Sequence, residues 1–538
     1  MMEPARILVV EDDPDWQVIF AGILEQGGFR SAVAATREQA EQLLATGFYH
    51  VVLLDVQLDP ADLENHDGLR LLSAWKDSRL LESMAVIMTS RHDRVNYIRD
   101  AFRHDSVDYL IKPEIGNGSG LLEKVREVLR DKVHYNGDVR ILWQSDEGRT
   151  DAVHGIWLGD RRVRRGTDEA ERVREELEDL LRRLFPTASS LMVDVMRPGL
   201  SGSGVLRVQG FFPQPVGAAE PVVVKFGDAG ALRQEHERYA SFVESFVGGH
   251  RSTTARRTAY TPRLGGIVYS FVGTSAGRLE DFGDFYRRSD VPAIADALGR
   301  LFNGTCRLWY GNRGPIEPLD LGADYRALLR FDAQNLERAL AEKLQSVQPG
   351  PRLRFTHLSK DVTLRNPIPL VTGRFIRSTV TAVTHGDFNE HNILLDAAGD
   401  AWLIDFMRTG RGHILRDVAQ LDSIVRFQLL APGEATLDER YEMERVLAAT
   451  AGTGEAAALA RAFPTENAAV RKAFEVSAAL RAIAARLMEA SGLSDFAEYQ
   501  LASMFFAVNT IRFYSVPQVQ REHALLAGAL LAERLVPA

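Results

Sequence analysis

The first 133 residues alternate short apolar runs with segments of helical spacing. Runs of four to six apolar residues predict buried strands, whereas apolar residues that recur every three or four positions predict amphipathic helices. We expect strands at 6–10, 31–35, 50–55, 84–88 and 107–111, and helices at 15–27, 37–46, 67–76, 92–103 and 119–133. This alternation predicts a doubly wound, five-stranded parallel sheet with helices on both faces.

Polar residues gather where these expected strands end, and the carboxyl ends of parallel strands are where functional groups collect. Several neighbouring carboxylates repel one another unless a hard cation neutralises them, which predicts a Mg²⁺ site. A lysine and a threonine at the same edge can hold phosphoryl oxygens. Helix capping would explain one acid per turn but not the matching lysine and threonine. The residues concerned are Glu11, Asp12, Asp13, Asp55, Thr89 and Lys112.

With these motifs, the segment 1–133 resembles the receiver domain of two-component response regulators, which has a flavodoxin-like fold. The resemblance implies a sensor histidine kinase as partner, and the last helices of receivers often form homodimers. One departure is a loop after the third strand that is about three residues longer than usual, beside the phosphorylation pocket. The implied roles are phosphoacceptor for Asp55, Mg²⁺ ligands for Asp12, Asp13 and Asp55, phosphoryl contacts for Thr89 and Lys112, and switch aromatic for Tyr109.

Residues 134–187 form an expected linker. Two apolar runs, "VRILWQ" and "HGIWLG", predict a hairpin, and residues 167–185 predict a helix that Thr167 can cap. The apolar stripe of this helix either packs on the following domain or forms a short coiled coil. Fewer than three heptads favour packing.

The stretch "HGDFNEHNILLDAAGDAWLIDF" at 385–406 places two short apolar strands around a turn, with Asp387, Asn392 and Asp405 beside them. Because Asp and Asn weaken strands, local structure does not call for them. Phosphoryl transfer from ATP needs one carboxylate near the acceptor hydroxyl, and a second carboxylate with an amide oxygen to hold Mg²⁺. These three residues therefore predict a phosphotransferase site.

An upstream segment offers the matching phosphate cradle. In "PGLSGSGVLRV", Gly202 and Gly204 allow backbone amides to approach phosphate oxygens. A buried-type strand, "PVVVKF", then carries Lys225, which is costly to bury without a partner. The next helix supplies Glu235 or Glu237 as that partner; we prefer Glu235, although the sequence does not separate the two. The strand "GGIVYSFV" at 265–272 follows as a platform for adenine.

From about residue 188 to 538 the chain resembles the aminoglycoside phosphotransferase branch of the protein-kinase-like fold, and more loosely the ternary-complex-associated domains. The resemblance implies a bilobal α+β fold, with an N-lobe at 188–272 and a C-lobe at 273–538 that is helical after 417. It rests on the HGDxxxxN spacing and the downstream "IDF", although Phe and Met follow that aspartate where many relatives have Trp or Phe-Gly. The implied roles are catalytic base for Asp387, Mg²⁺ ligands for Asn392 and Asp405, ATP binding for Ser201, Gly202, Ser203, Gly204, Lys225 and Glu235, and a brace for the loop at Arg416–Asp417.

Each element has a simpler interpretation. An SGSG stretch is usually a turn, and we assign His385 a structural role. A pseudokinase that binds nucleotide without transferring phosphate is the alternative output, although the complete set of Lys225, Asp387, Asn392 and Asp405 argues against it.

The whole-chain composition narrows the class of protein. With 538 residues the chain is long enough for two or three domains, and its net charge of −9 and pI of about 5.9 oppose nucleic-acid binding. The single cysteine, Cys306, excludes an intrachain disulfide, and no apolar run is long enough to span a membrane. We therefore expect a soluble cytoplasmic response regulator, gated by phosphorylation, whose output is an ATP-dependent phosphotransferase acting on an unknown hydroxyl compound.

Overall fold

The computed structural model describes residues 3–58, 66–196, 202–213, 216–246, 254–270, 279–330, 332–344 and 346–536. The chain divides into two compact units. The first unit comprises Met1–His236 and Thr254–Phe271, and the second comprises Glu237–Thr253 and Val272–Ala538.

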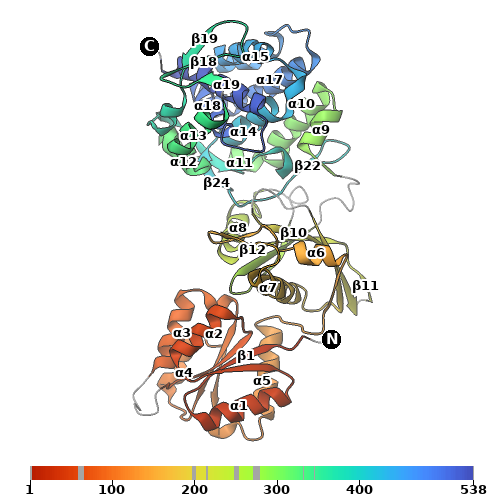
Figure 1. Cartoon of the computed structure of the whole chain (residues 1–538), viewed down its shortest axis with the longest axis vertical. Coiled ribbons are helices and arrows are strands. Elements are labelled where there is room, and N and C mark those ends of the chain that lie inside the picture. The colour runs from red at the N-terminus through yellow and green to blue at the C-terminus, as the bar shows by residue number, and fades with distance from the viewer. Residues whose placement is uncertain are drawn as a thin grey trace. The chain divides into compact units, whose positions relative to one another are not determined.

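The first unit begins with the expected parallel sheet, in the order β2-β1-β3-β4-β5 (Figure 1). All four strand pairings are parallel. This confirms the doubly wound sheet of a flavodoxin-like domain. Its strands are β1 (Arg6–Val10), β2 (Arg30–Ala34), β3 (Val51–Asp55), β4 (Ala85–Ser90) and β5 (Asp108–Ile111), and its helices are α1 (Pro14–Gln26), α2 (Arg37–Thr46), α3 (Asp67–Asp77), α4 (Val95–Arg103) and α5 (Ser119–Asp131).

Alternate residues of the central strands serve the two faces of this sheet. Ile7 and Val9 of β1 pack with buried residues of α1 and α5, whereas Leu8 and Val10 pack with buried residues of α2, α3 and α4. Because successive side chains of a strand point to opposite faces, a fully apolar strand needs helices on both sides. The apolar runs therefore place the polar residues that follow them at one edge of the sheet.

The first unit also contains a seven-stranded sheet, called the second sheet from here on. Its path is β13-β14-β12-β10-β9-β6, and β11 lies beside β10. Its central pairings, from β9 to β13, are antiparallel. The elements are β6 (Arg140–Trp143), α6 (Asp146–Asp151), β7 (Trp157–Leu158), β8 (Arg161–Arg162), α7 (Asp168–Leu184), β9 (Ser190–Val195), β10 (Gly204–Pro213), β11 (Val216–Ala218), β12 (Val222–Asp228), α8 (Ala229–Phe242), β13 (Ala255–Tyr260) and β14 (Leu264–Ser270).

The expected hairpin between "VRILWQ" and "HGIWLG" is wrong. The first run forms β6, which pairs in parallel with β9, and the second contributes β7, which pairs with β8. Helix α7 begins after Thr167, whose hydroxyl accepts a hydrogen bond from the backbone of Ala170. Its apolar stripe packs with residues of β9, β10, β12 and β14. Residues 134–187 thus contribute β6 to the second sheet, and apolar residues of this segment, from Val139 to Phe185, lie in its core.

The second unit is mainly helical, with several small sheets. Its strands are β15 (Glu280–Asp281), β16 (Glu317–Asp320), β17 (Val347–Gln348), β18 (Arg352–Phe355), β19 (Val362–Arg365), β20 (Ile376–Thr379), β21 (Thr381–Thr384), β22 (Ile393–Leu395), β23 (Ala401–Leu403) and β24 (Gly410–His413). Its helices are α9 (Phe282–Arg288), α10 (Val291–Arg300), α11 (Arg307–Gly311), α12 (Leu321–Leu329), α13 (Ala333–Lys343), α14 (Arg416–Ile424), α15 (Leu437–Ala449), α16 (Thr453–Ala458), α17 (Ala468–Glu489), α18 (Ala497–Thr510) and α19 (Gln518–Leu535).

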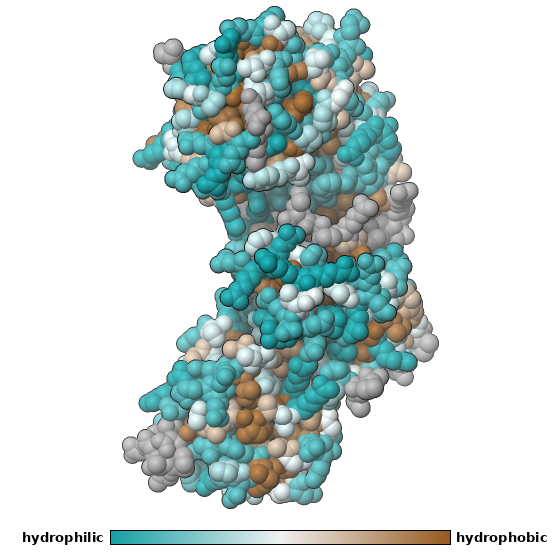
Figure 2. Space-filling model, in the orientation of Figure 1, coloured by the Kyte–Doolittle hydropathy of each residue, from teal (hydrophilic) through white to brown (hydrophobic). Residues whose placement is uncertain are grey.

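Hydrophilic residues dominate the visible surface, and hydrophobic ones are scattered among them (Figure 2). Within the described part of the chain, no helix combines the length and apolar character needed to cross a membrane.

The role of α7 in the core gives a stability prediction. Leu177 of α7 is fully buried, so we expect Leu177→Ala to destabilise the second sheet by about 2–5 kcal/mol. Faster amide exchange in β6, β9 and β10, measured by mass spectrometry, would report this loss. The control is Arg172→Ala on the exposed side of the same helix, and equal exchange in the two variants would contradict the assignment of α7 to this core.

Candidate functional site

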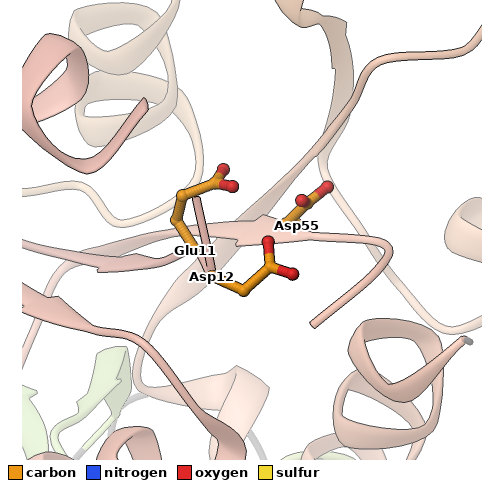
Figure 3. Close-up of side chains that lie close together, drawn as sticks. All are labelled: Glu11, Asp12 and Asp55. Carbon is orange, nitrogen blue, oxygen red and sulfur yellow. The ribbon is translucent and has the colours of Figure 1, made fainter. Parts of the chain in front are cut away.

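Three carboxylates converge at the carboxyl edge of the first sheet. Ligand oxygens of Glu11, Asp12 and Asp55 all lie within 4.8 Å of one another (Figure 3). The Nζ atom of Lys112 lies 2.7 Å from Asp55 Oδ2 and 2.7 Å from Glu11 Oε2, and its side chain is 1% exposed. Oxygen ligands in such a set suit Mg²⁺, so the residues present fit a hard-cation site.

The pKa values of the carboxyl groups in this cluster also indicate a cation site. Burial, and then the charge of Asp55, raises the pKa of Glu11 to about 8. Burial also raises the pKa of Asp55, against the opposing effect of Lys112. One lysine therefore does not compensate the whole group of carboxylates, and a bound cation would favour their ionised forms.

The neighbouring strands supply the expected phosphoryl contacts. Thr89 of β4 is paired in register with Asp55 of β3, and its buried hydroxyl has no hydrogen-bond partner among the described residues. The hydroxyl of Tyr109 donates to the backbone oxygen of His92 at 3.2 Å. Thr89 is thus poised to donate to an oxygen bound at Asp55, and Tyr109 is half-buried beside it.

The structure does not bring Asp13 into the acidic cluster. Its carboxylate caps α1 by accepting from the backbone of Asp15 at 2.9 Å, and it also forms an ion pair with Arg91. Glu11 takes the expected place instead: β1 ends at Val10, and the two residues that follow it, Glu11 and Asp12, join Asp55 in the cluster. The position of the strand end is the signal that could have identified Glu11.

A second polar site lies in the seven-stranded sheet of the first unit. Lys225 of β12 and Glu235 of α8 form an ion pair of 2.8 Å, with side chains 8% and 0% exposed. Tyr269 of β14 donates its hydroxyl hydrogen bond to the other carboxylate oxygen at 2.9 Å. Glu235 rather than Glu237 is therefore the partner of Lys225, and Glu237 is exposed.

The glycine stretch lies next to this strand. Gly202 has a φ of +76°, which disfavours other residues, and its carbonyl accepts from the backbone of Trp157 at 2.9 Å. Gly204 is paired with Phe226 of β12, and an added Cβ there would lie 2.2 Å from the Phe226 ring. Ser203 is buried, and the expected ATP contact at Ser201 lies outside the described residues.

The loop between β21 and β22 in the second unit is held by a buried carboxylate. Asp417 accepts hydrogen bonds from the backbone of His385 at 2.8 Å and of Gly386 at 3.0 Å, and from the hydroxyl of Tyr310 at 2.9 Å. This confirms the expected brace at Asp417, whereas Arg416 binds Asp324.

Within this loop, Asp387 is oriented by two amides. Nε2 of Gln420 and Nδ2 of Asn389 donate to Asp387 Oδ1 at 3.3 and 3.2 Å. The amide nitrogen of Asn392 donates to the Asp387 carbonyl at 2.8 Å, which leaves its oxygen for another partner. Sequence reasoning missed Gln420, because its distance from the loop in sequence gives no local signal.

The third polar residue follows β23. Strands β22 and β23 pair in antiparallel register, as expected, and Asp405 comes two residues after β23 with a φ of +65°. Such a conformation is uncommon for a residue other than glycine and costs of order 1–3 kcal/mol. His385 is fully buried, and its Nε2 bonds the Ile404 carbonyl at 3.0 Å, which agrees with a structural role.

Comparisons with known proteins identify the part of the chain that carries the acidic cluster. The response regulator receiver domain model matches residues 7–126, so this part of the chain is a receiver domain. Similar curated proteins include the NtrX-like response regulator of Rickettsia bellii (35% identity over 107 residues, 20% of this chain and 21% of that protein). The nitrogen assimilation regulatory protein NtrX of Azorhizobium caulinodans is 27% identical over 256 residues, 47% of this chain and 50% of that protein. The chain thus spans at most about half the length of these relatives.

A later part of the chain matches a different family. The model described as ternary complex associated domain 9 matches residues 188–345 and 342–512. This match covers more than half of the chain, and the protein belongs to this family. Among solved structures, a CheY-like receiver domain protein from Methanospirillum hungatei is 26% identical, covering 24% of this chain and 96% of that chain with a TM-score of 0.22.

The raised pKa of Glu11 gives a pH prediction. Below about pH 8 the folded protein holds a proton on Glu11, which a cation must displace. We expect Mg²⁺ affinity to rise by up to about tenfold per pH unit between pH 6 and 8 and then to level off. Calorimetric titration in buffers of different ionisation enthalpy would count the released protons. Glu11→Gln should flatten the profile, whereas the exposed Asp15→Asn should not.

The backbone of the second-unit loop gives another prediction. Gly386 has a φ of +76°, and a Cβ there would lie 2.4 Å from the Arg408 carbonyl. We expect Gly386→Ala to destabilise the second unit by at least about 1–2 kcal/mol, seen as a lower thermal midpoint. Gly299→Ala in α10, where nothing lies within 4 Å of the added Cβ, should be neutral or stabilising. A Gly386→Ala midpoint equal to wild type would contradict the close approach.

Proposed function

We propose that the protein is a phosphorylation-gated response regulator whose output domain is an ATP-dependent phosphotransferase of the protein-kinase-like type, acting on a hydroxyl acceptor. The receiver domain implies a sensor histidine kinase as the donor for Asp55. The observation that carries the proposed output is the buried ion pair of Lys225 and Glu235. In protein kinases a lysine on the third strand and a glutamate on the following helix form such a pair.

The surroundings of this pair support the proposal. An ion pair that is almost fully removed from water is expensive unless its hydrogen bonds are satisfied, and Tyr269 holds the second carboxylate oxygen of Glu235. The glutamate thereby fixes the position of the lysine amine on β12. A positioned cation of this kind suits the α- and β-phosphates of ATP. Gly202 and Gly204 lie before and at the start of β10, where backbone amides can approach phosphate oxygens.

The loop of the second unit supplies groups of the right chemistry. Gln420 and Asn389 hold one oxygen of Asp387, so the other oxygen is oriented to take a proton from an acceptor hydroxyl. Asn392 and Asp405 would hold Mg²⁺, which when bound neutralises charge on the transferring phosphates. His385 and Asp417 hold the loop backbone and take no part in the chemistry.

ATP binding can be tested by a thermal shift. We expect Mg²⁺ and ATP at about 100 times the dissociation constant to stabilise the wild type by about 2.7 kcal/mol. Lys225→Met and Asp405→Asn should lose this shift, measured for each variant against its own ligand-free midpoint. Lys360→Met on the exposed surface is the matched control. An unchanged shift in both site variants would overturn the proposed nucleotide site.

Catalysis is tested separately from binding. With water as acceptor, Asp387→Asn should keep the ATP-dependent shift but lower the rate of ATP hydrolysis by about 10²–10⁴-fold, the usual contribution of a general base. Radiolabelled phosphate release would measure the rate. Binding without hydrolysis in the wild type would instead identify a receiver-controlled scaffold with a nucleotide-binding pseudokinase.

A further inference from the structure

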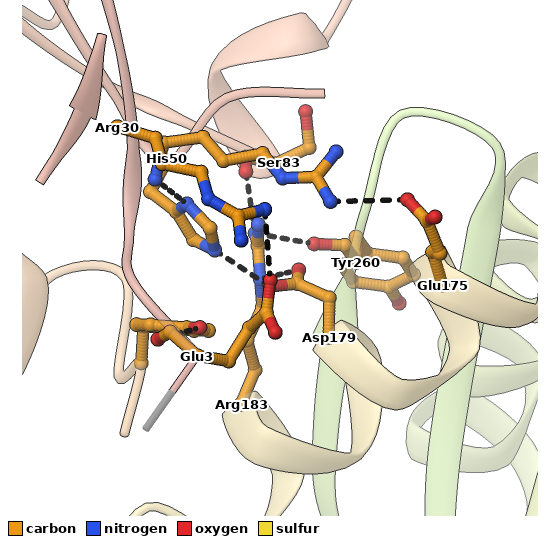
Figure 4. Close-up of polar contacts among 10 residues, drawn as sticks. Glu3, Arg30, His50, Ser83, Glu175, Asp179, Arg183 and Tyr260 are labelled. Carbon is orange, nitrogen blue, oxygen red and sulfur yellow. Dashed lines mark hydrogen bonds and ion pairs between the residues drawn. The ribbon is translucent and has the colours of Figure 1, made fainter. Parts of the chain in front are cut away.

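Helix α7 carries a buried charged cluster that contacts both sheets of the first unit (Figure 4). Asp179 lies 2.6 Å from Nε2 of His50 and 2.7 Å from Nε of Arg183. The side chains of these three residues are 1–4% exposed. Charges buried this completely hold their neighbours in place, because any shift would leave a polar group without its partner.

The hydrogen bonds define the protonation states within the cluster. The backbone N–H of Arg6 donates to Nδ1 of His50 at 2.9 Å, so the imidazole proton lies on Nε2 and donates to Asp179. Burial lowers the pKa of His50. Burial alone would raise the pKa of Asp179, but Arg183 and His50 lower it to about 2. A neutral imidazole, a carboxylate and a guanidinium thus form one hydrogen-bonded set, in which Nη2 of Arg183 has no hydrogen-bond partner among the described residues.

Arg183 extends the set to both sheets. Its Nη1 donates to the backbone oxygen of Ser83, close to the start of β4, and to that of Tyr260 at the end of β13 at 3.0 Å. One buried guanidinium therefore joins the segment that leads into β4 of the receiver to the end of β13 in the second sheet.

The receiver groups in this contact lie at a particular edge. His50 directly precedes β3, which ends at the phosphoacceptor Asp55. Ser83 lies two residues before β4, which carries Thr89. Helix α7 therefore holds the amino ends of the two strands whose carboxyl ends carry the phosphorylation site. Each of these strands is held by the hydrogen bonds of its sheet, so we expect a displacement at its amino end to be transmitted to its carboxyl end.

An adjacent face of α7, with Leu180 and Leu184, rests on the strand that supports the lysine–glutamate pair. An added Cβ at Gly266 of β14 would lie 2.9 Å from Leu184 and 3.0 Å from Leu180, so the helix packs directly on the β14 backbone. Three residues later, Tyr269 donates its hydroxyl hydrogen bond to Glu235, the partner of Lys225. Movement of α7 thus changes the support of that ion pair.

We infer that α7 couples the receiver to the lysine–glutamate pair, and that the receiver acts on its own output through the amino edge of its sheet. Phosphorylation of Asp55 shifts β3 and β4, the His50–Asp179–Arg183 cluster carries the shift to α7, and α7 repositions β14 and Glu235. The nucleotide-linked part of this inference rests on the proposed function. Because such coupling is a free energy between two sites, it is reciprocal.

The test measures that coupling directly. The dissociation constant of Mg²⁺–ATP is determined with and without beryllofluoride, which occupies Asp55 as a phosphoryl mimic. In the wild type we expect the two constants to differ by about fivefold or more, a typical coupling. His50→Phe removes the bond to Asp179 while leaving Arg183 paired, and should bring the ratio close to one with beryllofluoride binding retained. Arg172→Gln, exposed on the same helix, should keep the wild-type ratio.

A second variant and a second readout keep the test decisive. Arg183→Lys keeps a cation beside Asp179 but does not reach both the Ser83 and Tyr260 carbonyls. Amide exchange of β14 and α8 on beryllofluoride addition should change in the wild type and not in Arg183→Lys, and this readout needs no ATP. If the protein does not bind ATP but this exchange response is intact, the proposed function is wrong and the inferred role of α7 stands. A full response in both cluster variants, or none in the wild type, would overturn the role of α7.

Discussion

A carboxylate removed from water must be compensated by a cation or by several hydrogen bonds, and each candidate site of this protein is organised around one. The cation of Lys112 compensates the negative charges of Asp55 and Glu11, and that of Lys225 compensates the charge of Glu235. Hydrogen bonds from backbone amides stabilise the carboxylate of Asp417. The same constraint operates in the helical unit, where Arg426 is buried against Asp422 and Glu444. Compensation positions these groups, because a buried charge that moves loses its partners.

The receiver edge and the lysine–glutamate pair use this constraint differently. At the receiver edge the compensation is incomplete, since three carboxylates share one lysine, and the remaining negative charge suits a cation. At the lysine–glutamate pair one lysine faces one carboxylate, and Tyr269 donates to the second carboxylate oxygen. The first site is thus prepared to gain a charged ligand, whereas the second presents a lysine whose position depends on the elements around it.

Helix α7 is one of the elements on which the position of this lysine depends, because it packs on β14. The helix buries an apolar stripe in the core of the second sheet and a charged cluster against the receiver. A segment between two domains is often a spacer, but a helix packed on both sides constrains the two domains together. The family match begins at residue 188, so β6 and α7 lie before the matched region. They lie between the receiver match and this family match in the chain.

The sequence by itself determined the local elements and the residues at their ends. Alternating apolar runs predicted the five parallel strands and the polar edge with Asp55, Thr89 and Lys112, and the spacing at 385–405 predicted the loop with its flanking strands. Only the tertiary structure decided that Glu235 is the partner of Lys225 and that β6 pairs with β9. Periodicity reports which side of an element is buried, whereas the partner of a strand or a charge depends on residues far away in the chain.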